Sequence, residues 1–219
     1  LIMAHSDDDG LICPPRIASQ QVIIIPVTPK EDSRDAIIDA CEALATTLRH
    51  KDFHGEPLRV QVDKRDLAGG AKKWEWVKKG APIRIEIGPR DLESRKVCLQ
   101  RRDQAPNEKA FVPKEDFIRN ATDILHEIHA NLLAKATELR DSNITECSDM
   151  ETFDQHWSQE MPGWLVTPWN GSREQEEEIS KKHKITIRCL PIDQQDGPAA
   201  PCVLTGEATS QRAIWGRSY

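Results

Sequence analysis

A short stretch between residues 74 and 91 places basic, acidic and aromatic side chains at spacings that suit contact with a folded nucleic acid. Its sequence is WEWVKKGAPIRIEIGPRD. Arg84 and Glu86 alternate with three isoleucines, so a β-strand here would carry both charged side chains on one face. The same two charges could instead pair across a sheet with neighbouring strands. The strand pattern by itself favours this second interpretation.

The charge of the surrounding region differs from that of the whole chain. The 219-residue chain has a formal net charge of −6, whereas residues 59–102 contain 13 Lys or Arg and 6 Asp or Glu, a local charge of +7. A basic region on an acidic protein is what selective phosphate binding would require. A solvated surface with its counter-charges placed elsewhere would give the same count.

Two other groups of residues have side chains that metal ions bind. Asp7, Asp8 and Asp9 form an acidic turn, although an isolated turn of this kind is usually only solvated. His126 and His129 lie one turn apart on a predicted helix, with no third ligand evident in the sequence. We therefore expect no metal at either position.

The elements that must position the basic stretch predict a mixed α/β sheet. Helices are predicted over about 32–48, 70–79 and 114–141 from their apolar stripes. Strands are predicted at 22–25, 58–62, 83–87, 97–99 and 111–112. An alternating order of strands and helices implies crossover helices that flank the sheet.

A second, smaller α/β domain is predicted beyond residues 141–143, where the composition becomes acidic. Two helices are expected at 152–159 and 174–182, and three strands at 164–166, 185–187 and 213–215. Leu1 is not an initiator methionine, so we expect the chain to be a piece of something longer.

Composition excludes several classes of protein. The longest apolar run is only Val22 to Ile25, too short for a membrane span. Six cysteines have no disulfide-framework spacing, and the start of the chain does not resemble a signal peptide. Reduced thiols in a cytoplasmic protein are therefore the expectation.

Three stretches, taken in order, resemble the prolyl-tRNA synthetase family, a class II family, in its archaeal and eukaryotic form. They are MAHSDDDGLICPPR continuing into QVIIIP, then GAPIRIEIGPRD, and finally GRSY at the end of the chain. The resemblance implies that residues 1–20 are the end of a catalytic domain and a linker. Residues 21–142 would be an anticodon-binding domain, and residues 143–219 a small C-terminal domain.

The family's activity is then the expected function. The resemblance implies recognition of the tRNA(Pro) anticodon within an enzyme that joins L-proline to this tRNA with ATP through prolyl-adenylate. The full enzyme would use ATP and Mg and act as a cytoplasmic homodimer. Because the class II motifs would precede Leu1, no catalytic residue and no bound cofactor are expected here. DNA and membranes are not expected partners.

The residues present suit this implied role. Arg84 and Arg90 carry planar donors that can bind a guanine bidentately, and Glu86 or Asp91 can accept from its Watson–Crick edge. Many family members have a carboxylate where this chain has Val77, so any base contact made by that carboxylate cannot be carried over.

Aromatic and basic side chains just before the strand complete the expected interface. Trp74 and Trp76 offer stacking faces for unpaired bases, although an indole on a short amphipathic helix is more often part of a core. The lysines of this helix would contact phosphates without reading sequence. The predicted tRNA-binding residues are Arg84, Glu86, Arg90, Asp91, Lys72, Lys79 and Trp76.

The C-terminal domain departs from the family pattern. The family often holds a structural zinc there through four cysteines, and the corresponding positions are Asn170, Gln175, Cys202 and Thr205. One thiolate cannot replace four strong ligands. We therefore expect no zinc. A capping box from Ser172 to Gln175, with Trp164, Trp169 and Trp215, is expected to hold the domain instead.

Three alternatives remain open at the level of the sequence. The first is a free-standing, non-catalytic RNA-binding protein built on the same domain. The second is a small-molecule enzyme, which is disfavoured because PVTP follows the first strand where a Gly-rich phosphate loop would be needed. The third is a purely structural or interaction domain, which would show no salt-dependent RNA binding.

Overall fold

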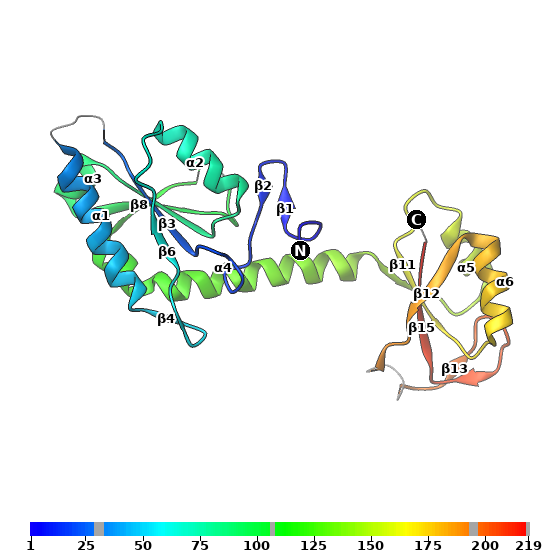
Figure 1. The fold of residues 1–219 in the computed structure, drawn as a ribbon. Helices are drawn as coiled ribbons and strands as arrows, with labels where there is room; N and C mark the ends of the chain where they lie inside the picture. The colour runs from blue at the N-terminus through cyan, green and yellow to red at the C-terminus, as the bar shows by residue number, and fades with distance from the viewer. Residues whose placement is uncertain (29–32, 106–107, 193–196, 218–219) are drawn as a thin grey trace. The chain divides into compact units, whose positions relative to one another are not determined.

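A computed structural model describes residues 1–28, 33–105, 108–192 and 197–217. These residues form two compact units, Leu1–Ala136 and Thr137–Tyr219. The division falls inside helix α4 (Lys114–Ser142). Each unit has its own sheet and its own core (Figure 1).

The first unit is built on a five-stranded mixed sheet in the order β6-β3-β7-β8-β9. The central strand β7 is parallel to β3 and antiparallel to β8, and β3 is also parallel to β6. All five predicted strands are confirmed, with the bounds β3 Val22–Pro26, β6 Val60–Val62, β7 Ile83–Ile87, β8 Lys96–Arg101 and β9 Ala110–Pro113.

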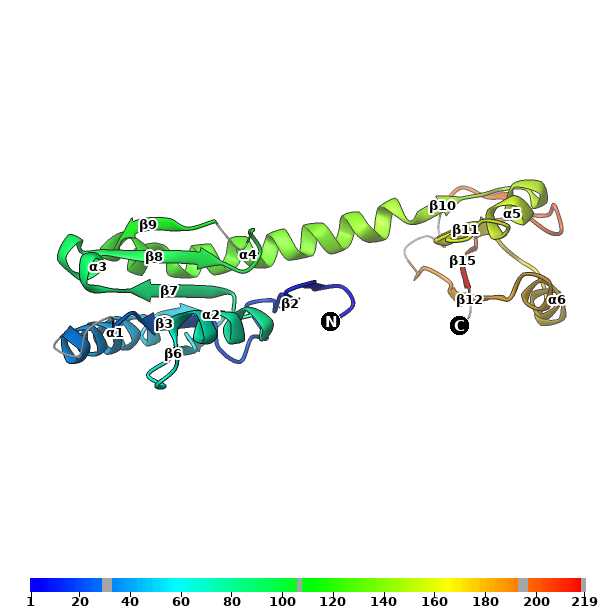
Figure 2. The ribbon, with the colours of Figure 1, turned by 90° about the horizontal axis from the view of Figure 1, so that it is seen from above.

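Helices cover the two faces of this sheet unequally. Helices α1 (Arg34–Arg49) and α4 share one core with the strand residues that face them, such as Ile24 and Ile85. On the other face, α2 (Gly69–Lys78) packs Trp76 against Ile23 and Ile25. Figures 1 and 2 show α2 and α4 on opposite sides of the strands. The period-2 alternation of the strands separates these two layers.

The N-terminal segment packs beside α2. Strands β1 (Ser6–Asp7) and β2 (Gly10–Leu11) form a hairpin whose Asp7 accepts a 2.7 Å hydrogen bond from Arg102. Gly80 has a φ of 73°, and a Cβ there would lie 2.6 Å from the carbonyl oxygen of Leu11. The carboxylate of Asp7, which belongs to the acidic turn, is thus already hydrogen-bonded to Arg102. The remaining short elements of this unit are β4 Asp52–Phe53, β5 Glu56–Pro57 and α3 Pro89–Ser94.

The second unit contains a four-stranded sheet in the order β10-β11-β15-β12. Its three predicted strands are confirmed, whereas β10 was not predicted; it pairs in parallel with β11 at the sheet edge. The strands of this sheet are β10 Ile144–Glu146, β11 Trp164–Pro168, β12 Ile185–Cys189 and β15 Arg212–Arg217. The unit also contains β13 Ala200–Pro201 and β14 Ala208–Thr209. Its helices are α5 Met150–Trp157 and α6 Arg173–His183.

Aromatic side chains form the core of the second unit. Trp215 is fully buried, and its ring meets Trp169 and Phe153 edge-on at centroid distances of 5.0 and 5.5 Å. Trp164, which was expected to help hold the domain, lies outside this buried cluster, because its side chain is 41% exposed. Trp157 is the additional buried indole.

No helix among the described residues is long and apolar enough to span a membrane. All six cysteines are present as free thiols.

Candidate nucleic-acid interface

Arg84 is the residue on which the predicted interface depends, and the structure buries it. The side chain, which was predicted to contact a base, lies on the α2 side of the sheet and is only 2% exposed. Its Nε and Nη1 atoms are buried without a hydrogen-bond partner among the described residues. Burial lowers the pKa of Arg84 to about 10, and the nearby positive charge of Arg102 acts in the same direction.

Gln100 lies directly opposite Arg84 in the antiparallel β7–β8 pair. Its Oε1 atom is also buried and has no partner among the described side chains and backbone, while its Nε2 donates to Glu86 Oε1 over 2.9 Å. Buried polar atoms in native proteins are almost always hydrogen-bonded to protein, water or ligand. Two buried donors and one buried acceptor therefore sit side by side with unused hydrogen-bonding capacity.

Gln100 was not predicted as a site residue. Its cross-strand register could have indicated it, but the predicted strand ended at residue 99. In the structure β8 continues to Arg101. The alternation that buries Val97 and Leu99 in the main core consequently turns Gln100 to the same face as Arg84.

Glu86 lies next along this face and is partly accessible. Its side chain is 20% exposed, and Lys109 Nζ lies 3.5 Å from its Oε2. Lys73 from α2 is close by: burial first, and then the positive charge of Lys109, lower the pKa of Lys73. Positive charges from two separate segments therefore lie near Glu86 and partly compensate its negative charge.

The loop that follows β7 presents a free cation. Arg90 is exposed, and its guanidinium has no hydrogen-bond or ion-pair partner among the residues that the structure describes. Asp91 instead accepts a 2.9 Å hydrogen bond from the backbone N–H of Gly88, which fixes the start of α3. One oxygen of Asp91 is therefore used structurally, while Arg90 remains available.

The prediction that Trp76 offers a stacking face to unpaired bases was wrong. Trp76 is 7% exposed, and its Nε1 donates to Asp63 Oδ2 over 2.8 Å. Lys79 lies over the ring, 4.7 Å from its centroid. Trp74 is 44% exposed, so it is the indole of α2 that remains open to solvent.

Asp63 organises the residues around α2. Its carboxylate receives hydrogen bonds from Arg65 at 2.9 and 2.7 Å, which chiefly account for a pKa of about 2. Its carbonyl oxygen accepts from Lys72 Nζ over 3.1 Å. Lys72, which was predicted to contact phosphate, is only 7% exposed. Lys79 is exposed and pairs with Glu75 at 2.6 Å.

The residues at the family's zinc positions are engaged in hydrogen bonds. Thr205 Oγ1 donates to Asn170 Oδ1 over 2.8 Å, and Asn170 Nδ2 donates to Glu207 over 3.1 Å. Gln175 completes the predicted capping box, accepting from Ser172 N over 2.8 Å. Three of the four positions supply only amide or hydroxyl groups, already bonded within the chain, so this donor set does not fit zinc.

Cys202 is the single thiol at these positions and is 2% exposed. Burial raises the pKa of Cys202, but hydrogen bonds from the Thr205 side chain and from the backbone of Thr205, Asn170 and Leu204 outweigh burial and lower the pKa below its usual value. Hydrogen-bond donors of the kind that suit a metal-bound thiolate therefore surround the Sγ atom of Cys202, the single cysteine at these four positions.

The structure adds a third ring to the histidine pair. His54 lies 5.0 Å from His126 and 6.4 Å from His129, measured between ring centroids. Within the described ranges, however, no group of three or more His, Cys, Asp or Glu side chains is arranged to hold a metal ion.

Comparison with known proteins connects both units to one family. A model of the anticodon binding domain matches residues 21–123, and a model described as prolyl-tRNA synthetase, C-terminal, matches residues 150–219. Proline–tRNA ligases from Akkermansia muciniphila, Protochlamydia amoebophila and Bdellovibrio bacteriovorus are 58%, 43% and 34% identical to this chain over 221, 227 and 222 residues.

Each of these three alignments covers 100% of the chain but 44% of the relative. The chain therefore spans less than half the length of the curated relatives that it matches. The two family models lie in the same order as the two structural units. The chain belongs to the prolyl-tRNA synthetase family, of which it represents the C-terminal part.

Proposed function

We propose that this chain recognises the anticodon of tRNA(Pro) as part of a proline–tRNA ligase. Residues 21–142 would be the anticodon-binding domain, residues 143–219 the C-terminal domain, and residues 1–20 the end of the catalytic domain with its linker. Support comes from the anticodon-binding match over residues 21–123 and from relatives that are proline–tRNA ligases. A free-standing RNA-binding protein is not favoured, because those relatives are ligases.

The observation that carries the proposal is the unused hydrogen-bonding capacity of Arg84 and Gln100. A base edge carries both donors and acceptors, and it can satisfy two buried arginine N–H groups and one amide oxygen together. A buried donor that lacks a partner costs about 1–3 kcal/mol, so a ligand that supplies the partner gains affinity. Glu86 lies beside this pair and would accept from a base.

Arg90 and Trp74 would supplement this contact. Arg90 is exposed and has no ion-pair partner in the described part of the chain, so its fork of donors can bind a guanine without breaking an existing bond. Trp74 would provide the stacking face that was first expected of Trp76. Asp91 would hold the loop, while Lys79 and Lys72 would supply positive charge.

For the full-length protein we propose ligation of L-proline to tRNA(Pro) through prolyl-adenylate. ATP and Mg would bind in the catalytic domain, and the enzyme would act as a cytoplasmic homodimer, without DNA or membrane partners. The C-terminal domain would fold without zinc, because its donor atoms are bonded within the chain.

Binding to paired transcripts tests the anticodon proposal. Fluorescence anisotropy would compare proline tRNA with the same transcript carrying a changed anticodon. We expect the wild-type chain to prefer proline tRNA, and Arg90→Ala to lower that preference about tenfold, since a bidentate base contact contributes roughly 1–3 kcal/mol. Lys79→Ala serves as the matched control, because it should weaken both transcripts alike. Equal affinity of the wild-type chain for the two transcripts would contradict the proposal.

A further inference from the structure

A small polar cavity lies at the carboxyl ends of the parallel strands β3 and β6, apart from the Arg84 face. Its volume is about 40 Å³. The polar side chains that line it are four cations, one acid and one hydroxyl: Arg34, Lys64, Arg65, Lys72, Asp66 and Thr28. Carboxyl ends of parallel strands are the usual place for ligands in α/β sheets. The lining is strongly positive.

Two of these cations have no carboxylate partner among the residues that the structure describes. Arg34 is half-buried and makes no ion pair among the described residues. Lys72 is 7% exposed, and the only hydrogen bond of its ammonium within the described ranges is to the carbonyl oxygen of Asp63, at 3.1 Å. A buried positive charge without a counter-charge costs free energy, so an anion in the cavity would offset that cost.

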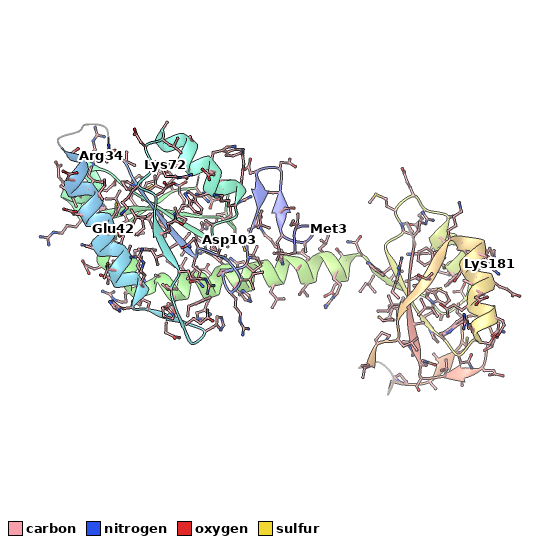
Figure 3. The ribbon with its side chains drawn as sticks, in the orientation of Figure 1. Met3, Arg34, Glu42, Lys72, Asp103 and Lys181 are labelled. Atoms are coloured by element: carbon pink, nitrogen blue, oxygen red, sulfur yellow. The ribbon has the colours of Figure 1, made fainter. Side chains whose placement is uncertain are left out.

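The other two cations are already paired on their outer sides. Lys64 Nζ lies 2.9 Å from Glu42, and Arg65 bonds Asp63 and Glu75. They shape the wall of the cavity, and their carboxylate partners do not line it. Arg34 and Lys72 are therefore the cations left to meet a ligand; Figure 3 shows Arg34 at the start of α1 and Lys72 on α2.

The backbone adds to the positive potential. Helix α1 is 16 residues long and begins at Arg34, so its first turn borders the cavity. The N-terminal end of a helix of this length carries a partial positive charge that favours anions. Helix and side chains thus act on the same small volume.

We propose that this cavity binds one phosphate group of the RNA backbone, with Arg34 and Lys72 as its main contacts. A volume of about 40 Å³ accommodates a phosphoryl group but leaves no room for a base or sugar. The phosphate must then belong to a molecule that lies outside the cavity. This inference rests on the proposed function, because an RNA bound along this edge is its source.

The position of the cavity fits an RNA that also reaches Arg90. Strand β7 runs parallel to β3, and Pro26 is paired with Ile87 at their carboxyl ends. The loop that carries Arg90 follows β7 directly. A phosphate at the end of β3 and a base beside Arg90 would therefore lie along one edge of the sheet.

The test is the salt dependence of tRNA binding by the whole chain. Arg34→Gln should lower the slope of log K against log salt by about one, the value for one lost phosphate contact. It should weaken proline tRNA and the changed-anticodon transcript by the same factor. Arg119→Gln is the matched control, because Arg119 is an exposed cation paired with Asp116 outside the cavity, and it should change nothing. A wild-type slope in Arg34→Gln would overturn the proposal.

A methylphosphonate scan of the anticodon stem-loop identifies the phosphate directly. Neutralising one phosphate position should weaken wild-type binding about tenfold and leave the binding of Arg34→Gln unchanged. Lys72→Met should show the same pattern, and circular dichroism verifies that this variant is folded. No position with this pattern would overturn the proposal. Stabilisation of the wild-type chain by inorganic phosphate, with the RNA affinity of Arg34→Gln intact, would assign the cavity to a free anion and also overturn it. If the wild-type chain showed no preference for the proline anticodon, the proposed anticodon recognition would be refuted, but the proposed phosphate site would not.

Discussion

The β7–β8 face of the first unit and the Asn170 corner of the second unit use polar side chains in opposite ways. At the first, Arg84 and Gln100 have three buried atoms without a hydrogen-bond partner in the described part of the chain. At the second, Asn170 and Gln175 use their amides within the chain. Unsatisfied groups raise the free energy of the unit that holds them, and a ligand can lower it. Satisfied groups stabilise the fold but offer a ligand little.

This difference is consistent with the proposed RNA-binding role of the first site and with a structural role for the second. Among the described residues of the first unit, the cations Arg34 and Arg90 have no ion-pair partner and Arg84 is buried; Arg84 and Arg90 lie in the stretch 59–102, which has a charge of +7. The second holds its corner with hydrogen bonds and its core with indole rings. Among the described residues the second unit also contains buried atoms without a hydrogen-bond partner, such as His156 Nε2 and Trp157 Nε1, so the contrast holds between these two sites and not between the whole units.

The largest expected effect is on the aromatic core of the second unit. Trp215→Ala should destabilise that unit by about 3–5 kcal/mol, because it removes a buried ring and its 3.0 Å hydrogen bond to Thr167. Urea unfolding followed by circular dichroism measures this. Trp164→Ala, at a ring that is 41% exposed, should cost much less. Equal losses in the two variants would show that the core is not centred on Trp215.

A smaller effect concerns Asp63 in the first unit. Its pKa in the folded state is about 2, below the usual range of an aspartate, so it stabilises the fold above pH 4 and loses this contribution as the pH falls through 2. Between pH 5 and pH 2 the loss from this group should be about 2 kcal/mol. Urea unfolding at several pH values should show that Asp63→Asn lacks this part of the acid sensitivity. Asp66→Asn is the control, and an acid sensitivity of Asp63→Asn equal to that of the wild type would contradict the assignment.

The hydrogen bonds of the Asn170 corner should each contribute modestly. Thr205→Val removes the hydroxyl that donates to Asn170 Oδ1 and accepts from Glu207 N, and it should destabilise the second unit by about 1 kcal/mol. Thr205→Ser keeps the hydroxyl and should cost less. The two variants are compared by thermal unfolding, and identical midpoints would show that the hydroxyl has no structural role there.

The smallest expected effect is that of metal removal. Because the donor set at Asn170, Gln175, Cys202 and Thr205 does not fit zinc, a chelator should leave the unfolding midpoint of the second unit unchanged. Elemental analysis is the complementary measurement. About one zinc per chain, or a midpoint lowered by chelation, would refute a metal-free domain.

Much of the fold could be predicted from the sequence because its signals are local. The alternation around Ile85 and the capping box at Ser172 each involve residues within a few positions of one another. The expected position of Trp76 failed because its partner Asp63 is 13 residues away. Local periodicity therefore indicated an amphipathic helix without showing where its indole would bond.

The candidate site could be predicted only in part, because its geometry depends on distant segments. The pattern placed Arg84 on a polar face but could not show that α2 covers this face and buries the side chain. Gln100 and Lys109 come from later segments that reach Glu86 through strand pairing. The cavity beside Arg34 combines residues that follow β3, residues that follow β6, and α2.

Hydrogen exchange of the whole chain with and without proline tRNA tests the central claim most directly. The division of roles predicts slower exchange in β7, α3, β8 and the first turn of α1, with little change in β11 and β15 of the second unit. The changed-anticodon transcript should protect the α1 turn but protect β7 and β8 less. Protection confined to the second unit, or identical protection of β7 and β8 by both transcripts, would contradict the account.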